Sequence, residues 1–325
     1  MTKAIRVYKP GPASALKWVD VEVGNPGPKE VRIRHTAVGL NYIDIYHRSG
    51  HNPLPFYPAP IGMEGAGVIE AVGRGVHDLK VGQRVAYATM PIGSYSEARL
   101  IAADRLVPLT PGINDEIAAA IMLKGMTAEY LIRRTYLVGK NDTILVHAAA
   151  GGVGTILCQW AKHLGATVIG TVGSAKKATL ARALGCAHVI DYTRQDVAQR
   201  VRKITKGAGV PVVFDGVGKT TFQGSIDSLA PRGLMVCFGN ASGPAPLIDA
   251  HMLSHKGSLY LTRPSLVTYT ATRADLLTSA RALFKVIADG HVKVDVSATY
   301  ALKDAAKAHR ELEGRKTTGS VVLIP

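Results

Sequence analysis

The sequence contains few of the residues that form covalent or metal cross-links. Among its 325 residues there are only three cysteines, Cys158, Cys186 and Cys237, and none lies within metal-clip spacing of another. This argues against a cysteine-based zinc site and against a disulfide framework. No uninterrupted apolar run approaches the roughly 20 residues that span a bilayer, and the N-terminus has no apolar core of signal-peptide length. We therefore expect a cytoplasmic protein that does not span a membrane.

Acidic residues are scarce relative to basic ones. Lys and Arg total 39 against 24 Asp and Glu, which gives a formal charge of +15. Such an excess favours anionic partners, which range from a phosphorylated cofactor to nucleic acid. Because no run of about five or six basic residues occurs, a generally basic, solvated surface is the favoured interpretation, and a nucleic-acid groove is the alternative.

The order of apolar runs along the chain predicts two kinds of domain. Up to about residue 112, short Val- and Ile-rich runs alternate with turn residues, as is typical of a compact, barrel-like β unit. A segment rich in alanine and leucine follows, with Asn114 or Asp115 as its helix N-cap. From about residue 143, apolar strands alternate with amphipathic helices, which predicts a doubly wound parallel sheet covered on both faces. The last strand, helix and strand are predicted to rejoin the β unit.

A glycine-rich loop, HAAAGGVG at residues 147–154, lies between the apolar run TILV and a helical segment, and a second strand follows. This context favours a dinucleotide-binding loop over a glycine turn without a ligand. Gly151 allows a tight turn, Gly152 the approach of a pyrophosphate, and Gly154 close packing of helix on strand. Ala149 replaces the usual first glycine, which is tolerable if the backbone there needs no positive φ. We read the loop as A-x-x-G-x-x-G beginning at Ala148.

The segment after the second strand predicts which dinucleotide binds. NAD-specific enzymes place an Asp or Glu about 20 residues after the loop. Here the segment TVGSAKK contains no acid, and Ser174, Lys176 and Lys177 offer a hydroxyl and two ammonium groups to a 2′-phosphate. The alternative is that both lysines are surface charges on the next helix, and we retain only Lys177 as a contact. The predicted cofactor is NADPH.

Further segments carry a resemblance to a known family. Together with AAAGGVG and GSAKK, the segments GLNYIDIYHRSG, GMEGAGVIEAVG, LKGMTAEYL, RGLMVCFGN and GSVVLIP resemble the zinc-free quinone oxidoreductases. These are the zeta-crystallin-like branch of the medium-chain dehydrogenase/reductase superfamily. The resemblance covers the whole chain and implies an α/β protein with a GroES-like β-barrel catalytic domain and a Rossmann doubly wound parallel-sheet domain. It places the catalytic domain at 1–123 and 292–325 and the Rossmann domain at 124–291, with NADPH in the cleft and usually a homodimer.

The resemblance also implies which residues contact the cofactor. Those on the nicotinamide side are Asn41, Tyr42, Ile43, Asp44, Tyr46, Thr127 and Tyr130. Those at the phosphates are Gly152 and Val153, and those at the 2′-phosphate are Gly173, Ser174, Lys177 and Tyr192. The remaining ones are Phe238, Gly239, Asn240, Pro264, Ser265, Leu266 and Arg315. The tyrosines have a second interpretation, since such rings commonly pack with only the hydroxyl in water. The loop HNPLPFYPAP differs from the more tyrosine- and serine-rich loop of related enzymes, so their substrate preference is not carried over.

Zinc-dependent relatives hold a catalytic ion with two cysteines and one histidine. The corresponding places in this chain are occupied by Asn41, Met63 and Lys124. Because an amide, a thioether and an ammonium cannot replace these ligands, we predict no metal. Without a Lewis acid, an alcohol or an unactivated carbonyl is a poor substrate. A quinone accepts hydride readily, so positioning and a few hydrogen bonds suffice.

We assign catalytic roles to Asn41, Asp44 and Lys124. Asn41 is expected to donate a hydrogen bond near the quinone or the nicotinamide, and the Lys124 ammonium to replace part of the lost positive charge. Asp44 either pairs with Lys124 or orients its loop. An equal alternative is that Lys124 and Asp44 form a buried ion pair that holds the two domains. No residue stands out as a general acid, which leaves solvent or a tyrosine as the proton source.

The predicted function is NADPH-dependent reduction of a quinone. One alternative is reduction of an activated C=C bond, as in alkenal or enoyl reductases of the same superfamily. Another is a nucleotide-retaining RNA-binding or structural protein, because zeta-crystallins serve as lens proteins and relatives have been linked to RNA. The +15 charge supports RNA binding, whereas the intact cofactor loop and the lack of an aromatic and basic strip oppose it. The apolar segment SLYLTRPS predicts an edge strand covered by a second copy in a homodimer, or in a tetramer.

Overall fold

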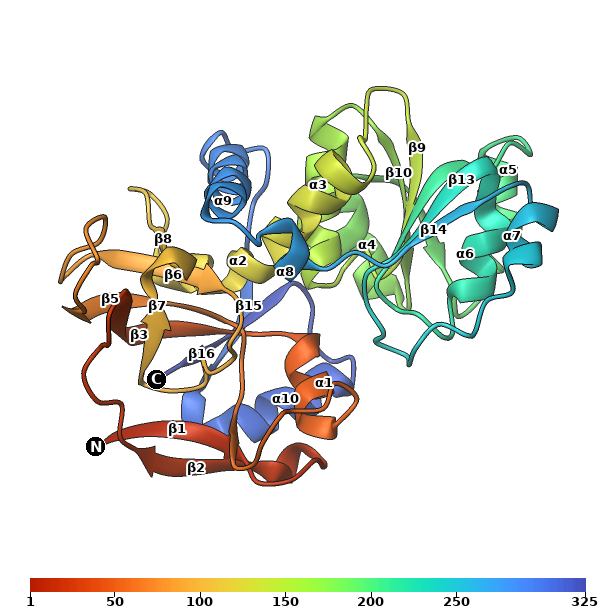
Figure 1. The fold of residues 1–325 in the computed structure, drawn as a ribbon. Coiled ribbons are helices and arrows are strands. Elements are labelled where there is room, and N and C mark those ends of the chain that lie inside the picture. Colours follow the sequence, from red (N-terminus) through yellow and green to blue (C-terminus); the bar gives the residue numbers. More distant parts are fainter. The chain divides into compact units, whose positions relative to one another are not determined.

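The computed structural model describes all 325 residues, which divide into two compact units. Unit 1 comprises Met1–Met126, Thr270–Ala288 and Val294–Pro325, and unit 2 comprises Thr127–Tyr269 and Asp289–Lys293. Figure 1 shows the elements of each unit. Unit 1 is thus formed by three separate stretches of the chain.

Residues 270–288 pack with unit 1, whereas the predicted boundaries placed them in the Rossmann domain. The Arg273 guanidinium donates to the carbonyl oxygens of Asp104 and Leu106, at 2.9 and 2.8 Å. Farther along the same helix, Leu283 fills the space beside Gly125, where an added Cβ would lie 2.5 Å from it. These contacts arise from side chains that face unit 1, which the helical periodicity of the segment does not reveal.

Unit 1 is built on two β-sheets. The seven-stranded sheet has the order β15-β16-β3-β5-β6-β8, with β7 also paired to β3, and the three-stranded sheet has the order β2-β1-β4. The strands are β1 (Thr2–Val7), β2 (Leu16–Val21), β3 (Glu30–Leu40), β4 (Ala59–Pro60), β5 (Glu64–Val72), β6 (Arg84–Ala88), β7 (Ala98–Ala102), β8 (Val107–Pro108), β15 (Val296–Ala301) and β16 (Ser320–Ile324). Alternate side chains of β3, including Val31 and Ile33, are buried against Ile69 and Leu106, as a strand with one face in a core requires.

The C-terminal strand completes the main sheet of unit 1. Strand β16 pairs antiparallel with the end of β3, with Val321 opposite Leu40. The helices of this unit are α1 (Tyr42–Ser49), most of α2 (Asp115–Tyr130), α9 (Arg273–Ala288) and α10 (Ala305–Glu313), besides short 3₁₀ turns at Ala13–Ala15, Ala103–Arg105 and Leu302–Asp304. Asn114 is the N-cap of α2, because its Oδ1 accepts from the N–H of Ile117 at 2.8 Å. No helix of the chain is both long and apolar enough to cross a membrane.

Unit 2 contains a six-stranded sheet in the order β11-β10-β9-β12-β13-β14. All its pairings are parallel. Figure 1 shows α3 and α4 on one face of this sheet and α5 and α6 on the other. The strands are β9 (Thr143–Val146), β10 (Thr167–Val172), β11 (Cys186–Asp191), β12 (Val210–Asp215), β13 (Leu229–Cys237) and β14 (Tyr260–Thr262). The helices are α3 (Gly152–His163), α4 (Ala175–Ala183), α5 (Val197–Ile204), α6 (Phe222–Ser228), α7 (Ala250–His255) and α8 (Leu266–Tyr269), and a π-helical turn at Leu131–Thr135 follows α2. The predicted doubly wound Rossmann sheet is confirmed.

Candidate active site

The glycine-rich loop lies at the carboxyl end of β9, where it leads into α3. Gly151 is the N-cap of α3 and no side chain caps the helix, so its first N–H groups remain available to an anion. A Cβ on Gly154 would lie 2.3 Å from the carbonyl oxygen of Ala148, so only glycine allows the helix to pack this closely. An uncapped helix N-terminus beside a close-packed glycine loop fits the pyrophosphate of a dinucleotide.

The unusual alanines of this loop differ in backbone conformation. Ala148 has a φ of +52°, in the left-handed region that L-residues with a Cβ rarely adopt. Ala149 is not among the residues with positive φ, and its side chain is fully buried. The condition under which alanine replaces the first glycine therefore holds at Ala149, and the backbone strain lies one residue earlier.

The residues expected at the 2′-phosphate surround the end of β10. Ser174 is the N-cap of α4, and its Oγ accepts from the N–H of Lys177 at 3.3 Å. A Cβ on Gly173 would lie 2.4 Å from the Tyr192 hydroxyl, so the glycine makes room for that ring. Asp191, at the end of β11, accepts instead from the N–H and the hydroxyl of Thr193. The site thus gathers two hydroxyls and a lysine, with no carboxylate on β10, which fits a 2′-phosphate.

The other predicted cofactor residues of unit 2 follow β13 and β14 or end α2. A Cβ on Gly239 would lie 2.3 Å from the Gly216 carbonyl oxygen, so the segment Phe238, Gly239, Asn240 passes close to the turn after β12. Pro264, Ser265 and Leu266 connect β14 to α8. At the end of α2, near Thr127, the buried Tyr130 ring stacks on Tyr269 with centroids 4.4 Å apart.

A fully hydrogen-bonded polar cluster lies directly before the glycine loop. The His147 ring bonds Thr171 Oγ1 through Nδ1 and Ser225 Oγ through Nε2, both at 2.9 Å. The Asp215 carboxylate accepts from the hydroxyls of Thr221 and Ser225 and from the N–H groups of Val217 and Gly218. Because this cluster ties β9, β10, β12 and α6 together, it fixes the backbone from which the glycine loop begins.

The three predicted catalytic residues come together in unit 1. Asn41 is the N-cap of α1 and its N–H donates to Asp44 Oδ2 at 2.9 Å, so the two residues form a capping box. The Asn41 side-chain amide donates to Glu64 Oε2 at 2.7 Å, and Lys124 Nζ donates to the same oxygen at 3.2 Å. Asn41 and Lys124 are only 4% and 5% exposed, and Asp44 and Glu64 are completely buried.

The predicted pairing of Lys124 with Asp44 is wrong, because the carboxylate that binds the Lys124 ammonium belongs to Glu64. The other expectation, that Asp44 orients the loop, agrees with its capping box. Glu64 lies opposite Gly39 in the pairing of β5 with β3, and a Cβ on Gly39 would lie 2.3 Å from Glu64 Oε2. Sequence reasoning missed Glu64, although it stands in the segment GMEG that carried the resemblance.

A row of buried polar side chains extends from Asp44 to the surface of unit 1. The Tyr95 hydroxyl lies 3.0 Å from Asp44 Oδ2 and 3.0 Å from His309 Nε2. Arg48 Nη1 lies 3.2 Å from His309 Nδ1, and the Arg48 guanidinium forms a two-pronged ion pair with Glu313 at 2.6 and 3.0 Å. Burial raises the pKa of Asp44 to about 7.

The remaining residues of unit 1 that were predicted to contact the cofactor are Tyr42, Ile43, Tyr46 and Arg315. The rings of Tyr42 and Tyr46 meet edge to face on α1, with centroids 5.5 Å apart. Ile43 packs on an apolar cluster that contains Met63. The thioether at a zinc-ligand position is therefore part of a core, and the chain has no group of three or more His, Cys, Asp or Glu residues arranged to hold a metal ion.

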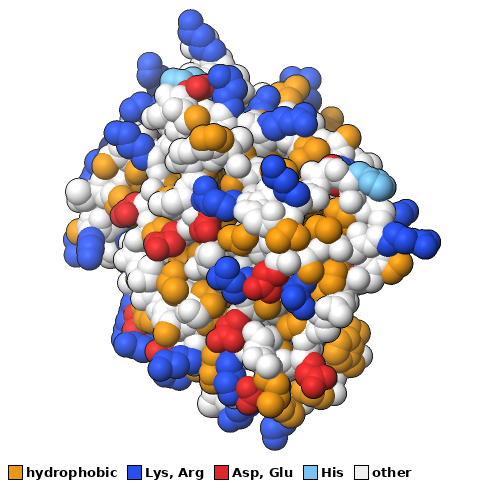
Figure 2. All heavy atoms as spheres, turned by 90° about the vertical axis from the view of Figure 1, so that its left-hand side faces the viewer, with side chains coloured by type: hydrophobic (Ala, Val, Ile, Leu, Met, Phe, Trp, Pro, Cys, Tyr) orange, Lys and Arg blue, Asp and Glu red, His pale blue; other side chains and the backbone are white.

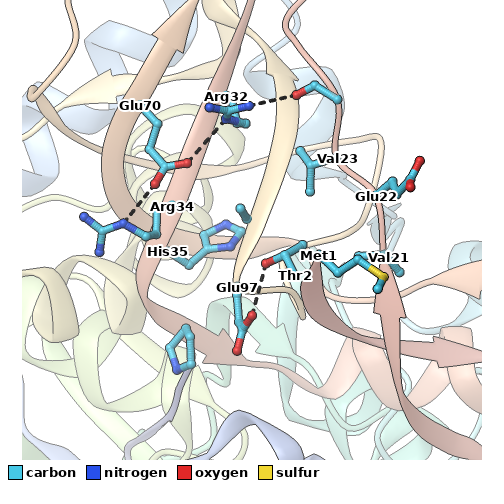
Figure 3. A pocket seen from close by; sticks show the side chains of 13 residues that line it. Met1, Thr2, Val21, Glu22, Val23, Arg32, Arg34, His35, Glu70 and Glu97 are labelled. Carbon is cyan, nitrogen blue, oxygen red and sulfur yellow. Dashed lines mark hydrogen bonds and ion pairs between the residues drawn. The ribbon is translucent and has the colours of Figure 1, made fainter.

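A separate hollow of about 670 Å³ opens among β1, β2, β3, β5 and β7 of unit 1 and contains none of the predicted site residues. In Figure 3 the Glu70 carboxylate lies between Arg32 and Arg34, at 3.4 and 3.0 Å from their Nε atoms. His35 is held by the Ser96 carbonyl and the Tyr87 hydroxyl. Because the two arginines share the Glu70 carboxylate and both ring nitrogens of His35 are hydrogen-bonded, the hollow is a weaker candidate than the cluster around Lys124.

Comparison with known proteins agrees with both units. Residues 27–142 match the family described as alcohol dehydrogenase GroES-like domain, and residues 152–277 match the family described as zinc-binding dehydrogenase. The chain is 51% identical to the quinone oxidoreductase of Pseudomonas aeruginosa over 325 residues, with all of both chains covered. It is 46% identical to the 2-haloacrylate reductase of a Burkholderia species, covering 100% of this chain and 99% of the relative.

A solved structure gives the same result. The Escherichia coli quinone oxidoreductase complexed with NADPH has a TM-score of 0.98 and 46% identity to this chain, covering 99% of this chain and 100% of the other. Asn41, Met63 and Lys124, which the resemblance places at the zinc-ligand positions of zinc-dependent relatives, contact a carboxylate and an apolar core. The chain belongs to the zinc-free quinone oxidoreductases of the medium-chain dehydrogenase/reductase superfamily.

Proposed function

We propose that this protein is an NADPH-dependent quinone oxidoreductase that transfers hydride without a metal. The observation that carries the proposal is the ammonium of Lys124, which is nearly buried and has Glu64 as its hydrogen-bond partner. A lysine ammonium has three N–H donors. The two that Glu64 does not use can bind a substrate oxygen, at the place where zinc-dependent relatives have a metal ligand.

The residues of unit 2 bind and orient the cofactor, and NADPH when bound supplies the hydride. The N–H groups at the start of α3 would bind the pyrophosphate, and Ser174, Lys177 and Tyr192 would hold the 2′-phosphate. The polar cluster of His147, Ser225 and Asp215 keeps the glycine loop in the conformation that this binding needs. Cofactor affinity and the preference for NADPH therefore depend on unit 2.

The residues of unit 1 stabilise charge on the substrate. As a quinone accepts hydride, negative charge develops on its oxygen, and a preorganised ammonium stabilises that charge without a metal. Glu64 holds the ammonium in place and also fixes the Asn41 amide. The aromatic product delocalises the remaining charge, so this modest electrostatic assistance is sufficient for a quinone.

The proposal is tested by following NADPH oxidation with benzoquinone and phenanthrenequinone, beside NADH and beside an EDTA-treated sample. We expect turnover that depends on quinone, prefers NADPH and survives chelation. Tight NADPH binding without quinone turnover would contradict the proposed substrate, and activity lost with EDTA and restored by zinc would contradict the metal-free mechanism.

A second candidate is reduction of an activated C=C bond. It is supported by the 46% identity to a protein named 2-haloacrylate reductase. Such a substrate also develops negative charge on an oxygen next to the reacting carbons, so Lys124 would serve it equally well. A panel that compares quinones with 2-alkenals and 2-haloacrylate at equal concentration separates the two, because the true substrate class gives the higher kcat/KM.

An RNA-binding role has less support. On the face seen in Figure 2, Lys and Arg side chains are scattered and interrupted by acidic and apolar ones, rather than gathered into one strip. Single-stranded nucleic acid needs a continuous basic groove with aromatic platforms. A salt-dependent mobility shift with single-stranded RNA that NADPH competes away would revive this alternative.

We further propose a homodimer formed through β14, the edge strand of the sheet in unit 2. Its other side is paired to β13, and Tyr260 on it is 62% exposed. A short apolar edge covered by a symmetry mate would satisfy its free backbone groups. Sedimentation equilibrium of wild type and of Leu261→Pro, which disrupts β14, tests this. The proposed location is the cytoplasm, because all three cysteines are buried and free.

A further inference from the structure

Tyr95, His309 and Arg48 form a row of hydrogen-bonded side chains that ends at Asp44, and the donor of each bond in this row is fixed. A guanidinium has donors and no acceptor, so His309 Nδ1 must accept from Arg48. A neutral imidazole then carries its hydrogen on Nε2 and donates it to the Tyr95 oxygen. Tyr95 is left to donate its own hydrogen to Asp44 Oδ2.

The two middle members of the row stay neutral near physiological pH. Burial, and then the charge of Arg48, lower the pKa of His309 to about 3. A protonated His309 would also direct an Nδ1 hydrogen at the Arg48 donor. Burial raises the pKa of Tyr95 well above its usual value. Neither side chain therefore exchanges a proton in the neutral range, and both act as fixed donors.

This direction determines where Asp44 can hold a proton. Its Oδ2 already receives the Asn41 N–H and the Tyr95 hydroxyl, so a proton on that oxygen would meet two donors. Its Oδ1 is buried and has no hydrogen-bond partner. A protonated Asp44 must therefore carry its hydrogen on Oδ1. Within this row of side chains, Asp44 Oδ1 is therefore the one atom that can take up or release a proton in the neutral range.

Several charged or titratable groups face this carboxyl. They are Lys124 on α2, Glu64 on β5, Tyr95 in the loop before β7 and, through Tyr95, His309 on α10 and Arg48 on α1. Burial has the largest effect and raises the pKa of Asp44 to about 7. The hydrogen bonds from Asn41 and Tyr95 act to lower it, as does the charge of Lys124, whereas Glu64 raises it. Because the interaction between Asp44 and Lys124 is mutual, the charge on Asp44 also acts on Lys124.

We propose that Tyr95, His309 and Arg48 are positioning residues that act on the reaction through Asp44. The row confines the proton of Asp44 to Oδ1, and the charge on Asp44 sets how much positive charge Lys124 presents to a substrate oxygen. The inference rests on the proposed role of Lys124 in quinone reduction. With Asp44 protonated, Glu64 is the carboxylate that offsets the charge of Lys124, and with Asp44 ionised a second negative charge acts on Lys124 through space without contacting it. Turnover should therefore fall as rising pH removes the proton from Asp44.

The experiment measures the titration of Asp44 directly and compares it with kcat. Infrared difference spectra recorded against pH follow the C=O stretch of the protonated carboxyl, and Asp44→Asn identifies the band by its loss. Tyr95→Phe removes a donor that favours the charged carboxylate, so the midpoint should rise by about one pH unit. The fall of kcat with pH should move upward by the same amount in Tyr95→Phe. In Asp44→Asn, kcat should not vary across this range.

Two variants serve as controls. Tyr87→Phe is matched to Tyr95→Phe, because Tyr87 is also fully buried in unit 1 and its hydroxyl bonds His35 Nε2 at 2.7 Å, outside the row. Its midpoint should equal that of wild type. His309→Gln keeps a side-chain N–H for Tyr95, so the midpoint of its Asp44 titration should stay close to that of wild type.

The outcomes separate this inference from the proposed function. Equal midpoints in wild type, Tyr95→Phe and Tyr87→Phe would overturn the inference, as would a titrating carboxyl band that persists in Asp44→Asn. A shifted band without a shifted kcat profile would overturn the action through Lys124. If no variant, including wild type, reduces quinones, the proposed function fails, while the infrared titration can still be read.

Discussion

The two units each bury one aspartate that a hydroxyl group links to a histidine, and the two aspartates differ in how many hydrogen bonds their oxygens accept. Asp215 in unit 2 accepts from four donors spread over both oxygens. Asp44 in unit 1 accepts from two donors on Oδ2, and its Oδ1 is buried without a partner. A carboxylate whose two oxygens both accept hydrogen bonds has a structural role, whereas one with an oxygen that accepts none can still take up a proton there. Burial alone therefore does not mark a functional acid, whereas a buried carboxyl oxygen without a hydrogen-bond partner does.

The largest expected difference is in stability. Asp215→Asn replaces an acceptor with an NH₂ group that faces donors, so it should lower the free energy of unfolding by about 4 kcal/mol. Asp44→Asn keeps an acceptor for the two bonds of Oδ2 and places its NH₂ where Oδ1 has no partner, so it should stay within about 1 kcal/mol of wild type. Denaturant unfolding of the two variants measures both values, and equal losses would remove the distinction.

The next effect is on turnover and belongs to unit 1. Lys124→Met should lower kcat about 100-fold, because it removes the positive charge aimed at the substrate oxygen, and should leave the KM for NADPH nearly unchanged. It also leaves Glu64 buried without its ion partner. The double variant Glu64→Gln with Lys124→Met restores charge balance and should recover thermal stability without recovering kcat. Unchanged kcat in folded Lys124→Met would leave the lysine only a structural role.

The corresponding effect in unit 2 should appear in cofactor binding. Lys177→Ala should raise the KM for NADPH about 10-fold, since one charge near the 2′-phosphate is lost, and should not change kinetics with NADH. Lys176→Ala is the matched control, because that lysine was not retained as a contact. Equal effects of the two substitutions, or an equal rise with NADH, would mean that the preference for the 2′-phosphate is set elsewhere.

The smallest effect concerns the strained residue of the glycine loop. Ala148→Gly removes the Cβ from a residue at positive φ, a gain that the larger entropy of glycine in the unfolded chain partly offsets. The net result should be a stabilisation of about 0.5 kcal/mol. Lys162→Gly within α3, where φ is not positive, should instead destabilise the protein by about 1 kcal/mol. Thermal unfolding of the pair checks the sign, and a destabilised Ala148→Gly would contradict the strain.

Much of the fold could be predicted because its signals are local. The alternation of strands and helices after residue 143, the glycine loop before α3, and Asn114 as the cap of α2 depend on residues close in sequence. The assignment of residues 270–288 differed, because a helical pattern does not say which unit its apolar face contacts. The absence of an acid after β10 and the absence of zinc-ligand residue types at three positions could also be seen in short segments of the sequence.

The sequence by itself determined which residue types stand at single positions: a glycine-rich loop predicted to receive phosphates, a lysine where the resemblance places a zinc ligand, and an aspartate expected to orient its loop. Only the tertiary structure decided their partners. Lys124 meets Glu64, 60 residues away, because α2 packs where β5 pairs with β3, with the Ala119 carbonyl and the Glu64 carboxylate both next to Gly39. Tyr95 meets His309, 214 residues away, because the chain end returns as α10 and β16. A hydrogen bond needs its two atoms within about 3 Å, and no spacing along the chain specifies that distance until the sheets have formed.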